Sequence, residues 1–252
     1  FNPSATGTAT IADNDATPSL SIDNVSVNED ASTLTFTVTL SAASGLPVTF
    51  SYASTNGTAT AGSDYTAVSG TGTIAAGATT ATITVPILED VIYEGSESFN
   101  ITLSNPVNAT INDGLGIGTI VDNEAKPTLS VSPVTVTVTE GTDAYAEFTV
   151  SLSGVSSTAT VVNLSLTAGT ASTADFGPGL EVFNGTDWIA ASSATIAAGS
   201  TSVLVRTPIV DDLLNENDEQ FTLTATTTSG NTFNPSATGT ATIADNEFLN
   251  KL

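Results

Sequence analysis

The feature that most limits how this chain can fold is a strict alternation of apolar and hydroxyl-bearing residues. Residues 33–40 read Thr-Leu-Thr-Phe-Thr-Val-Thr-Leu, and residues 134–139 alternate Val with Thr. A period of two residues is that of a β-strand with one face in a core and the other in water. No segment carries the period of 3.6 residues that a helix requires. We therefore expect almost no helix.

Segments of strand length recur along the whole chain, separated by clusters of Gly, Asn, Asp and Ser. Roughly seven such segments in every ~110 residues are typical of an antiparallel β-sandwich. The apolar fraction of 40% is sufficient for a packed core, so the acidity of the chain does not indicate disorder. The sequence therefore predicts an all-β protein.

Internal repeats indicate two similar domains taken from a longer array. Residues 1–14 and 233–246 are identical, residues 86–90 match residues 208–212, and the second half carries an insertion at 176–191. The predicted divisions are the tail of a preceding repeat at 1–15, a first domain at 16–124, a second domain at 125–247, and the start of another repeat or a cloning remnant at 248–252.

Composition excludes several classes of function. The chain contains no His and no Cys, which excludes a Ser-His-Asp triad, a Cys nucleophile, an imidazole or thiolate metal site and a disulfide. Three basic residues against 26 acidic ones give a net charge of −23. This charge disfavours nucleic acid and direct membrane contact as partners. No segment approaches the ~20 apolar residues of a transmembrane helix, and no signal peptide is visible at Phe1, so we expect an internal piece of a longer protein.

The carboxylates gather in clusters at predicted strand ends, and the clusters repeat in both halves. In the first half they comprise Glu29; Asp64; Glu89, Asp90, Glu94 and Glu97; and Asp122 with Glu124. In the second half they comprise Glu140; Asp175; Asp211, Asp212, Glu216 and Glu219; and Asp245 with Glu247. Because strand ends distant in sequence meet at the poles of a sandwich, we expect the four clusters of each half to converge.

Converging carboxylates with almost no Lys or Arg among them repel one another. Two unit charges ~4 Å apart cost about 1 kcal/mol in water and about 4 kcal/mol at an effective dielectric constant of 20. Ca²⁺ relieves such repulsion because it accepts six to eight oxygen ligands in a flexible geometry, whereas Mg²⁺ requires an octahedron and retains its waters. A single acidic loop is ordinarily solvated surface, but repetition of four clusters favours a calcium site.

These motifs resemble the Calx-β domain. Its most specific pattern, Pro-Ile-x-x-Asp-x-x-x-Glu-x-x-Glu-x-Phe, stands at residues 86–99 and 208–221. The resemblance implies two tandem immunoglobulin-like sandwiches of about seven strands each, with Ca²⁺ at one pole. It implies that the clustered carboxylates are ligands, and it adds the backbone carbonyls of Ile92 and Leu214. The closing Asp-Asn-Glu departs from the consecutive Asp residues of exchanger-type domains. Asn123 and Asn246 offer only a neutral oxygen, so we expect fewer or weaker-bound ions.

The Gly- and Thr-rich, Met-free repeats also resemble the extender repeats of a large RTX-type bacterial surface adhesin. We therefore expect a monomeric, calcium-rigidified spacer on the outside of a bacterial cell, and not an enzyme. Its partners would be neighbouring repeats of the same chain, and any adhesion ligand would bind another domain.

Several alternative functions remain open. They are a calcium-sensing regulatory module, a glycosidase with a carboxylate pair, a carbohydrate-binding module built on Phe183 and Trp188, and a binder of ice or another solid surface built on Thr-x-Thr segments such as Thr240–Thr242. A lone Trp in such a loop more often caps the edge of a core, and Thr-x-Thr is ordinary on the solvent face of a twisted strand.

Overall fold

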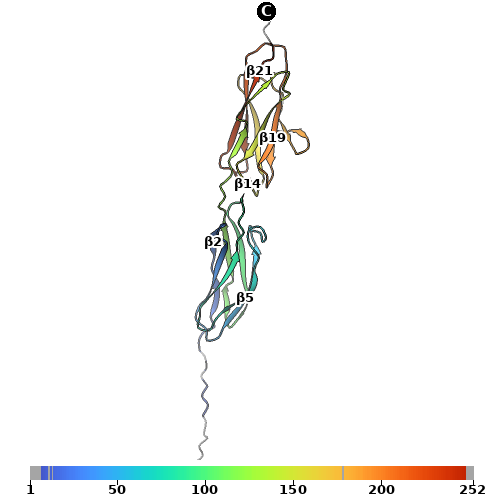
Figure 1. Cartoon of the computed structure of the whole chain (residues 1–252). Coiled ribbons are helices and arrows are strands. Elements are labelled where there is room, and N and C mark those ends of the chain that lie inside the picture. Colours follow the sequence, from blue (N-terminus) through green and yellow to red (C-terminus); the bar gives the residue numbers. More distant parts are fainter. Residues whose placement is uncertain (1–6, 11, 13, 178, 248–252) are drawn as a thin grey trace, which may run out of the picture. The chain divides into compact units, whose positions relative to one another are not determined.

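The computed structural model describes residues 7–10, 12, 14–177 and 179–247, which form strands, turns and loops without a helix. The predicted all-β class is therefore confirmed. The chain divides into two compact units, residues 1–89 with 96–122 and residues 90–95 with 123–252. Each unit is built mainly from two layered sheets (Figure 1). The expected tail at 1–15 is described only in part, and the expected remnant at 248–252 lies outside the described residues.

The first unit pairs a four-stranded sheet with a five-stranded sheet. The first sheet has the order β6 (Thr80–Pro86), β3 (Thr33–Leu40), β1 (Ser19–Ile22) and β9 (Thr110–Asp113). The second sheet has the order β2 (Val25–Asn28), β10 (Leu115–Val121), β8 (Glu97–Val107), β4 (Val48–Asn56) and β5 (Ser69–Ile74).

The second unit repeats this plan with two five-stranded sheets. The first has the order β11 (Leu129–Ser132), β13 (Tyr145–Leu152), β19 (Ser202–Pro208), β16 (Glu181–Phe183) and β17 (Trp188–Ala190). The second has the order β12 (Thr135–Thr139), β21 (Ser236–Ala244), β20 (Glu219–Thr227), β15 (Thr160–Ala168) and β18 (Ser193–Ile196). A further parallel pair joins β7 (Ile92–Tyr93) to β14 (Val155–Ser156), and residues 90–95 group with this unit.

Each sandwich has more than seven strands, and one reason is that its opening strand passes from one sheet to the other; in the first unit β9 also stands apart from β10 in the other sheet. In the first unit the chain leaves β1 at Asp23 and enters β2 after Asn24. The Asp23 carboxylate accepts a hydrogen bond from Thr37 N at 2.7 Å, and the Asn24 side-chain oxygen accepts one from Ile117 N at 2.7 Å. These side chains supply the acceptors that a continuous strand would have provided. In the second unit β11 and β12 divide in the same way, and the insertion adds the β16–β17 hairpin.

Most strand pairs are antiparallel, but the opening strand runs parallel to the last one in both units. Val25 to Asn28 of β2 pair with Gly118 to Val121 of β10. Thr135 to Thr139 of β12 pair with Thr240 to Ala244 of β21. Because the pairing is parallel, the ends of β12 and β21 reach the same pole of the second sandwich.

The predicted alternation separates the faces of the strands as expected. Leu34, Phe36, Val38 and Leu40 of β3 are buried, while the Thr residues between them are exposed or half-buried. Each sandwich has its own hydrophobic core. In the second core Gly239 of β21 lies so close to Val131 that an added Cβ would be 2.7 Å from Val131 Cγ1. The absence of a side chain at this position therefore allows the two sheets to approach.

Candidate metal-binding site

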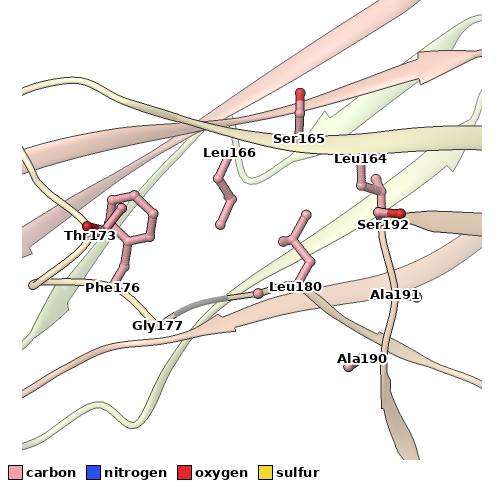
Figure 2. Close-up of a pocket in the computed structure, with 11 residues that line it drawn as sticks. Leu164, Ser165, Leu166, Thr173, Phe176, Gly177, Leu180, Ala190, Ala191 and Ser192 are labelled. Carbon is pink, nitrogen blue, oxygen red and sulfur yellow. The ribbon is translucent and has the colours of Figure 1, made fainter.

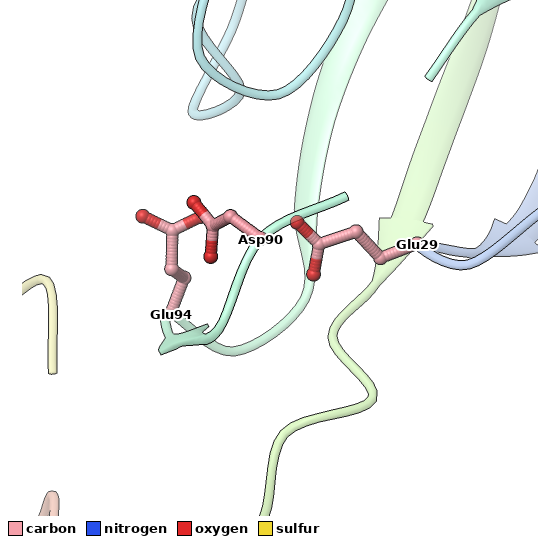
Figure 3. Close-up of side chains that lie close together, drawn as sticks. All are labelled: Glu29, Asp90 and Glu94. Atoms are coloured by element: carbon pink, nitrogen blue, oxygen red, sulfur yellow. The ribbon is translucent and has the colours of Figure 1, made fainter. Parts of the chain in front are cut away.

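The structure brings most of the predicted carboxylates together in groups of three, in which one oxygen of each residue lies within 4.8 Å of the others. In the first repeat the groups are Glu29–Asp90–Glu94, Glu29–Asp122–Glu124 and Asp64–Glu94–Glu97, and Figure 3 shows the first of them. In the second repeat the groups are Glu140–Asp245–Glu247 and Asp175–Glu216–Glu219. Two groups therefore recur at matching positions of both repeats.

Parallel strand pairing explains why Glu140 meets the closing motif although more than 100 residues separate them. Glu140 directly follows β12, and its backbone N–H donates to Ala244 O, the last residue of β21, at 3.1 Å. The next residue, Asp245, lies therefore beside Glu140. In the first repeat Glu29 N donates to Val121 O at 2.9 Å in the same manner. The sheet register thus places a carboxylate of the first strand against those of the last.

Asp175, the buried acid of the Asp175–Glu216–Glu219 group, is held by a tight turn. Asp175 accepts a hydrogen bond from the backbone N–H of Ser172, and its own carbonyl accepts one from Val210 N at 3.0 Å. Burial acts to raise the pKa of Asp175, but hydrogen bonds from Ser172 and from Glu219 outweigh burial and lower the pKa below its ordinary value. Asp64 occupies the corresponding turn in the first repeat and accepts a hydrogen bond from Thr60 N.

Glu140 is a buried acid whose pKa is strongly raised. Its side chain is 4% exposed, and its Oε2 atom is buried without a hydrogen-bond partner. Burial, followed by the charges of Asp212, Asp245, Glu247 and Glu216, raises the pKa of Glu140 to about 7. No ion pair links Glu140, Asp245 or Glu247 to a basic side chain in the part of the chain that the structure describes. The group is therefore an uncompensated concentration of acid.

The closing motif adds hydrogen bonds that the sequence did not reveal. A hydrogen bond shared with Glu247 lowers the pKa of Asp245 and raises that of Glu247. Asn246 was expected to offer an oxygen, but its side-chain N–H groups donate to Glu140 O at 2.9 Å and to Asp211 Oδ1 at 3.0 Å. The residue therefore acts as a donor between two segments of the site.

Among the described residues, these groups do not include three further predicted ligands, Glu89, Asp211 and Asp212. The groups comprise side-chain oxygens alone, so they do not test the backbone carbonyls of Ile92 and Leu214. The Asp212 carboxylate accepts a hydrogen bond from Leu214 N at 2.7 Å, and the Asp90 carboxylate accepts one from Ile92 N at 2.7 Å. These bonds form short turns that order the acidic loops. That each of these atoms binds a metal stays a prediction.

Trp188 lies in the β16–β17 hairpin and not in an irregular loop. The Arg206 guanidinium carbon stands 4.1 Å from the centre of its ring and 3.6 Å from that of Tyr145, and Arg206 Nε donates to Glu181 at 2.7 Å. The Phe183 ring lies 5.4 Å from Trp188. This stack holds the hairpin to β19 and accounts for Trp188 without a ligand.

A cavity of about 430 Å³ lies between β15 and the insertion of the second unit (Figure 2). Leu164, Leu166, Phe176 and Leu180 form its apolar walls, and Ser165, Thr173 and Ser192 supply hydroxyl groups. No acidic or basic side chain is among the described residues that line it. The cavity therefore has no part in the carboxylate site.

Comparison with known proteins agrees with this architecture. The model of the Calx-beta domain matches twice, over residues 12–119 and 122–247. No curated protein matches the sequence. Solved structures similar to this chain include CBD12 from CALX1.2 (14% identity, 84% of this chain and 82% of that chain, TM-score 0.41). They also include the apo-form Calx CBD1 domain (19% identity, 43% of this chain and 100% of that chain, TM-score 0.41). A third is the calcium binding domain CBD12 of CALX1.1 (15% identity, 82% of this chain and 79% of that chain, TM-score 0.40).

Proposed function

Because the chain belongs to the Calx-beta domain family through two consecutive domains, we propose that both domains bind Ca²⁺ through their paired carboxylate groups. The observation that carries this proposal is Glu140, an acid that is 4% exposed and has an unpartnered Oε2 atom beside Asp245 and Glu247. A buried charged oxygen without a partner is costly. A cation shared by the three carboxylates removes that cost.

The donor set supports Ca²⁺ as the ion. All the candidate side-chain ligands are carboxylates, and they come from loops and strand ends of different segments. Ca²⁺ accepts six to eight such oxygens at 2.3–2.6 Å without demanding a fixed polyhedron. The uncharged Oε2 of a protonated Glu140 would become a ligand after loss of its proton, so calcium binding and deprotonation of this group are coupled.

We further propose that the chain is an extender segment of a bacterial surface adhesin. The identity of residues 1–14 with residues 233–246 supports an array of near-copies, which suits reach better than regulation. Residues 125–128 alone separate the closing motif of the first domain from β11. Calcium bound at this motif would restrict the connection. The proposed setting is the outside of a bacterial cell, and the proposed chain is a monomer. Its partners are neighbouring repeats of the same chain, and any adhesion ligand binds another domain of the protein. Nucleic acid, direct membrane contact and catalysis are not part of the proposal.

Calcium binding is tested by counting ions and by melting the chain in chelator, in ~5 mM Ca²⁺ and in ~5 mM Mg²⁺. We expect bound Ca²⁺ by equilibrium dialysis and a melting temperature raised by Ca²⁺ alone. One site at a free concentration 100 times its dissociation constant stabilises the folded state by about 2.7 kcal/mol. Identical melts in all three solutions, with no bound ion, would refute the proposal.

The extender role has its own test. Small-angle X-ray scattering of the whole chain should show a narrower distribution of interatomic distances in Ca²⁺ than in chelator. An unchanged distribution in a sample with measured bound Ca²⁺ would leave calcium binding in place and remove the rigid-spacer function.

A further inference from the structure

The side-chain amide of Asn246 stands at a point where oxygen atoms of two segments converge. Its nitrogen donates to the backbone carbonyl of Glu140 at 2.9 Å and to Asp211 Oδ1 at 3.0 Å. Glu140 directly follows β12, and Asp211 belongs to the loop that follows β19. A backbone carbonyl and a carboxylate are the oxygen types that bind Ca²⁺. Here a neutral N–H donor occupies the position between them.

The surroundings are built closely around this amide. An added Cβ at Gly141 would lie 2.4 Å from Asn246 Nδ2 and 2.7 Å from Asp211 Oδ1. Gly141 also has a φ of +62°, which favours glycine. The glycine therefore leaves the room that the amide and Asp211 fill. The half-buried Asn246 amide is therefore packed against Gly141 while it contacts both oxygens.

Exchange of the amide for a carboxylate would reverse the chemistry of this contact. An Asp at position 246 would place an oxygen where the nitrogen now stands, facing the Glu140 carbonyl and the Asp211 carboxylate. Three acceptors would then meet without a donor, and two of them would be negative. Such a set is stable when a cation lies between its members.

We propose that Asn246 occupies the place of a cation and thereby sets the number of ions in the second domain. The amide ties Asp211 to the Glu140 loop without metal, and ions enter only beside the Glu140, Asp245 and Glu247 carboxylates and the Asp175 group. This inference rests on the proposed calcium function, and Asn246 acts in it as a residue that determines stoichiometry.

The test is the number of Ca²⁺ ions bound per chain of 252 residues, measured by equilibrium dialysis at saturating Ca²⁺ for the wild type, Asn246→Asp and Asn217→Asp. Asn217 is an exposed residue of the same acidic loop, so its substitution adds the same charge without altering the contact. We expect Asn246→Asp to bind one more ion than the wild type and Asn217→Asp to bind the same number. In chelator Asn246→Asp should melt below the wild type, and Ca²⁺ should raise its melting temperature by a larger increment.

Each outcome decides between the two proposals. Equal ion counts for the wild type and Asn246→Asp, with the wild type binding Ca²⁺, would overturn the inference alone. No ion on the wild type and one on Asn246→Asp would support the inference and overturn the calcium function of the natural domain. No ion on either would overturn both. If Asn246→Asp fails to fold even in Ca²⁺, the variant Asn246→Ala is measured instead. An unchanged ion count with a lower melting temperature in chelator would support the inference that the amide links the two segments without metal. An unchanged melting temperature in chelator would overturn it.

Discussion

Replacement of Glu140 by Gln is expected to stabilise the second sandwich when calcium is absent and to remove most of its stabilisation by calcium. The pKa of Glu140 is about 7 in the folded chain, against an ordinary value of 4.5. Because the folded state holds this proton more tightly, its contribution to stability is complete below pH 4.5 and is lost as the pH rises through 7. At ~1.4 kcal/mol for each pH unit, the loss amounts to about 3 kcal/mol. The amide of Gln cannot ionise and avoids this loss.

The single Trp of the chain makes the second sandwich separately observable. Trp188 stacks on Arg206 within that unit, so its fluorescence reports unfolding there. Urea unfolding in chelator should give similar free energies for both proteins at pH 5. At pH 8 the Gln variant should exceed the wild type by about 3 kcal/mol, equivalent to roughly 10 °C in melting temperature for a domain of this size. Addition of ~5 mM Ca²⁺ at pH 8 should reverse the order.

A matched control separates burial from the loss of one negative charge. Asp187→Asn makes the same chemical change on an exposed side chain of the same unit and should leave the pH dependence in chelator unaltered. If Glu140→Gln also leaves it unaltered, the burial of Glu140 is not what sets the stability of the calcium-free domain, and the physical reasoning above is wrong.

Three further changes test other parts of the structure. Asp175→Asn keeps an acceptor for Ser172 N and should fold, but it should weaken calcium binding at least ten-fold, about 1.4 kcal/mol, in a calorimetric titration; unchanged affinity would exclude Asp175 as a ligand. Arg206→Lys removes a planar cation from the ring of Trp188 and should lower the free energy of unfolding by about 1–2 kcal/mol. The Trp emission should also shift to longer wavelength, and an unshifted spectrum would contradict the stack. Gly239→Ala should lower the free energy of urea unfolding by about 1–3 kcal/mol, because the new Cβ would lie 2.7 Å from Val131 Cγ1. Gly154→Ala is the control: no atom lies within 4 Å of its new Cβ, so the free energy of unfolding should fall far less.

The strands could be predicted from sequence because their signal is local. The alternation around Phe36 depends only on which face of one strand enters the core, and the buried residues follow it without exception along β3. The transfer of the opening strand between sheets could not be predicted in this way. It depends on Asp23 and Asn24 meeting the backbones of Thr37 and Ile117, and the second of these partners lies more than 90 residues away.

The candidate site divides along the same line. The convergence of Glu140 with Asp245 could be expected from repeated clusters at strand ends, and the structure brings their oxygens together. The direction of the Asn246 amide could not be predicted from sequence, because composition does not say whether an amide presents its oxygen or its nitrogen. The pairing of β12 with β21 decides it by placing the Glu140 carbonyl within reach of the nitrogen. The stack of Trp188 on Arg206 likewise depends on the register of β16 with β19.

The parallel pairing of the opening and closing strands also has a mechanical consequence. The chain runs along β12 and β21 in the same direction, so β12 begins at one pole of the sandwich and β21 ends at the opposite pole. Tension applied through the two ends therefore pulls β12 and β21 past each other lengthwise. The hydrogen bonds that link Thr135–Thr139 to Thr240–Ala244 are then loaded in shear, so they bear the force together and do not break one after another. The same holds for β2 and β10 in the first unit, so each domain resists stretching through the strand pair that also aligns its buried Glu with the closing acids.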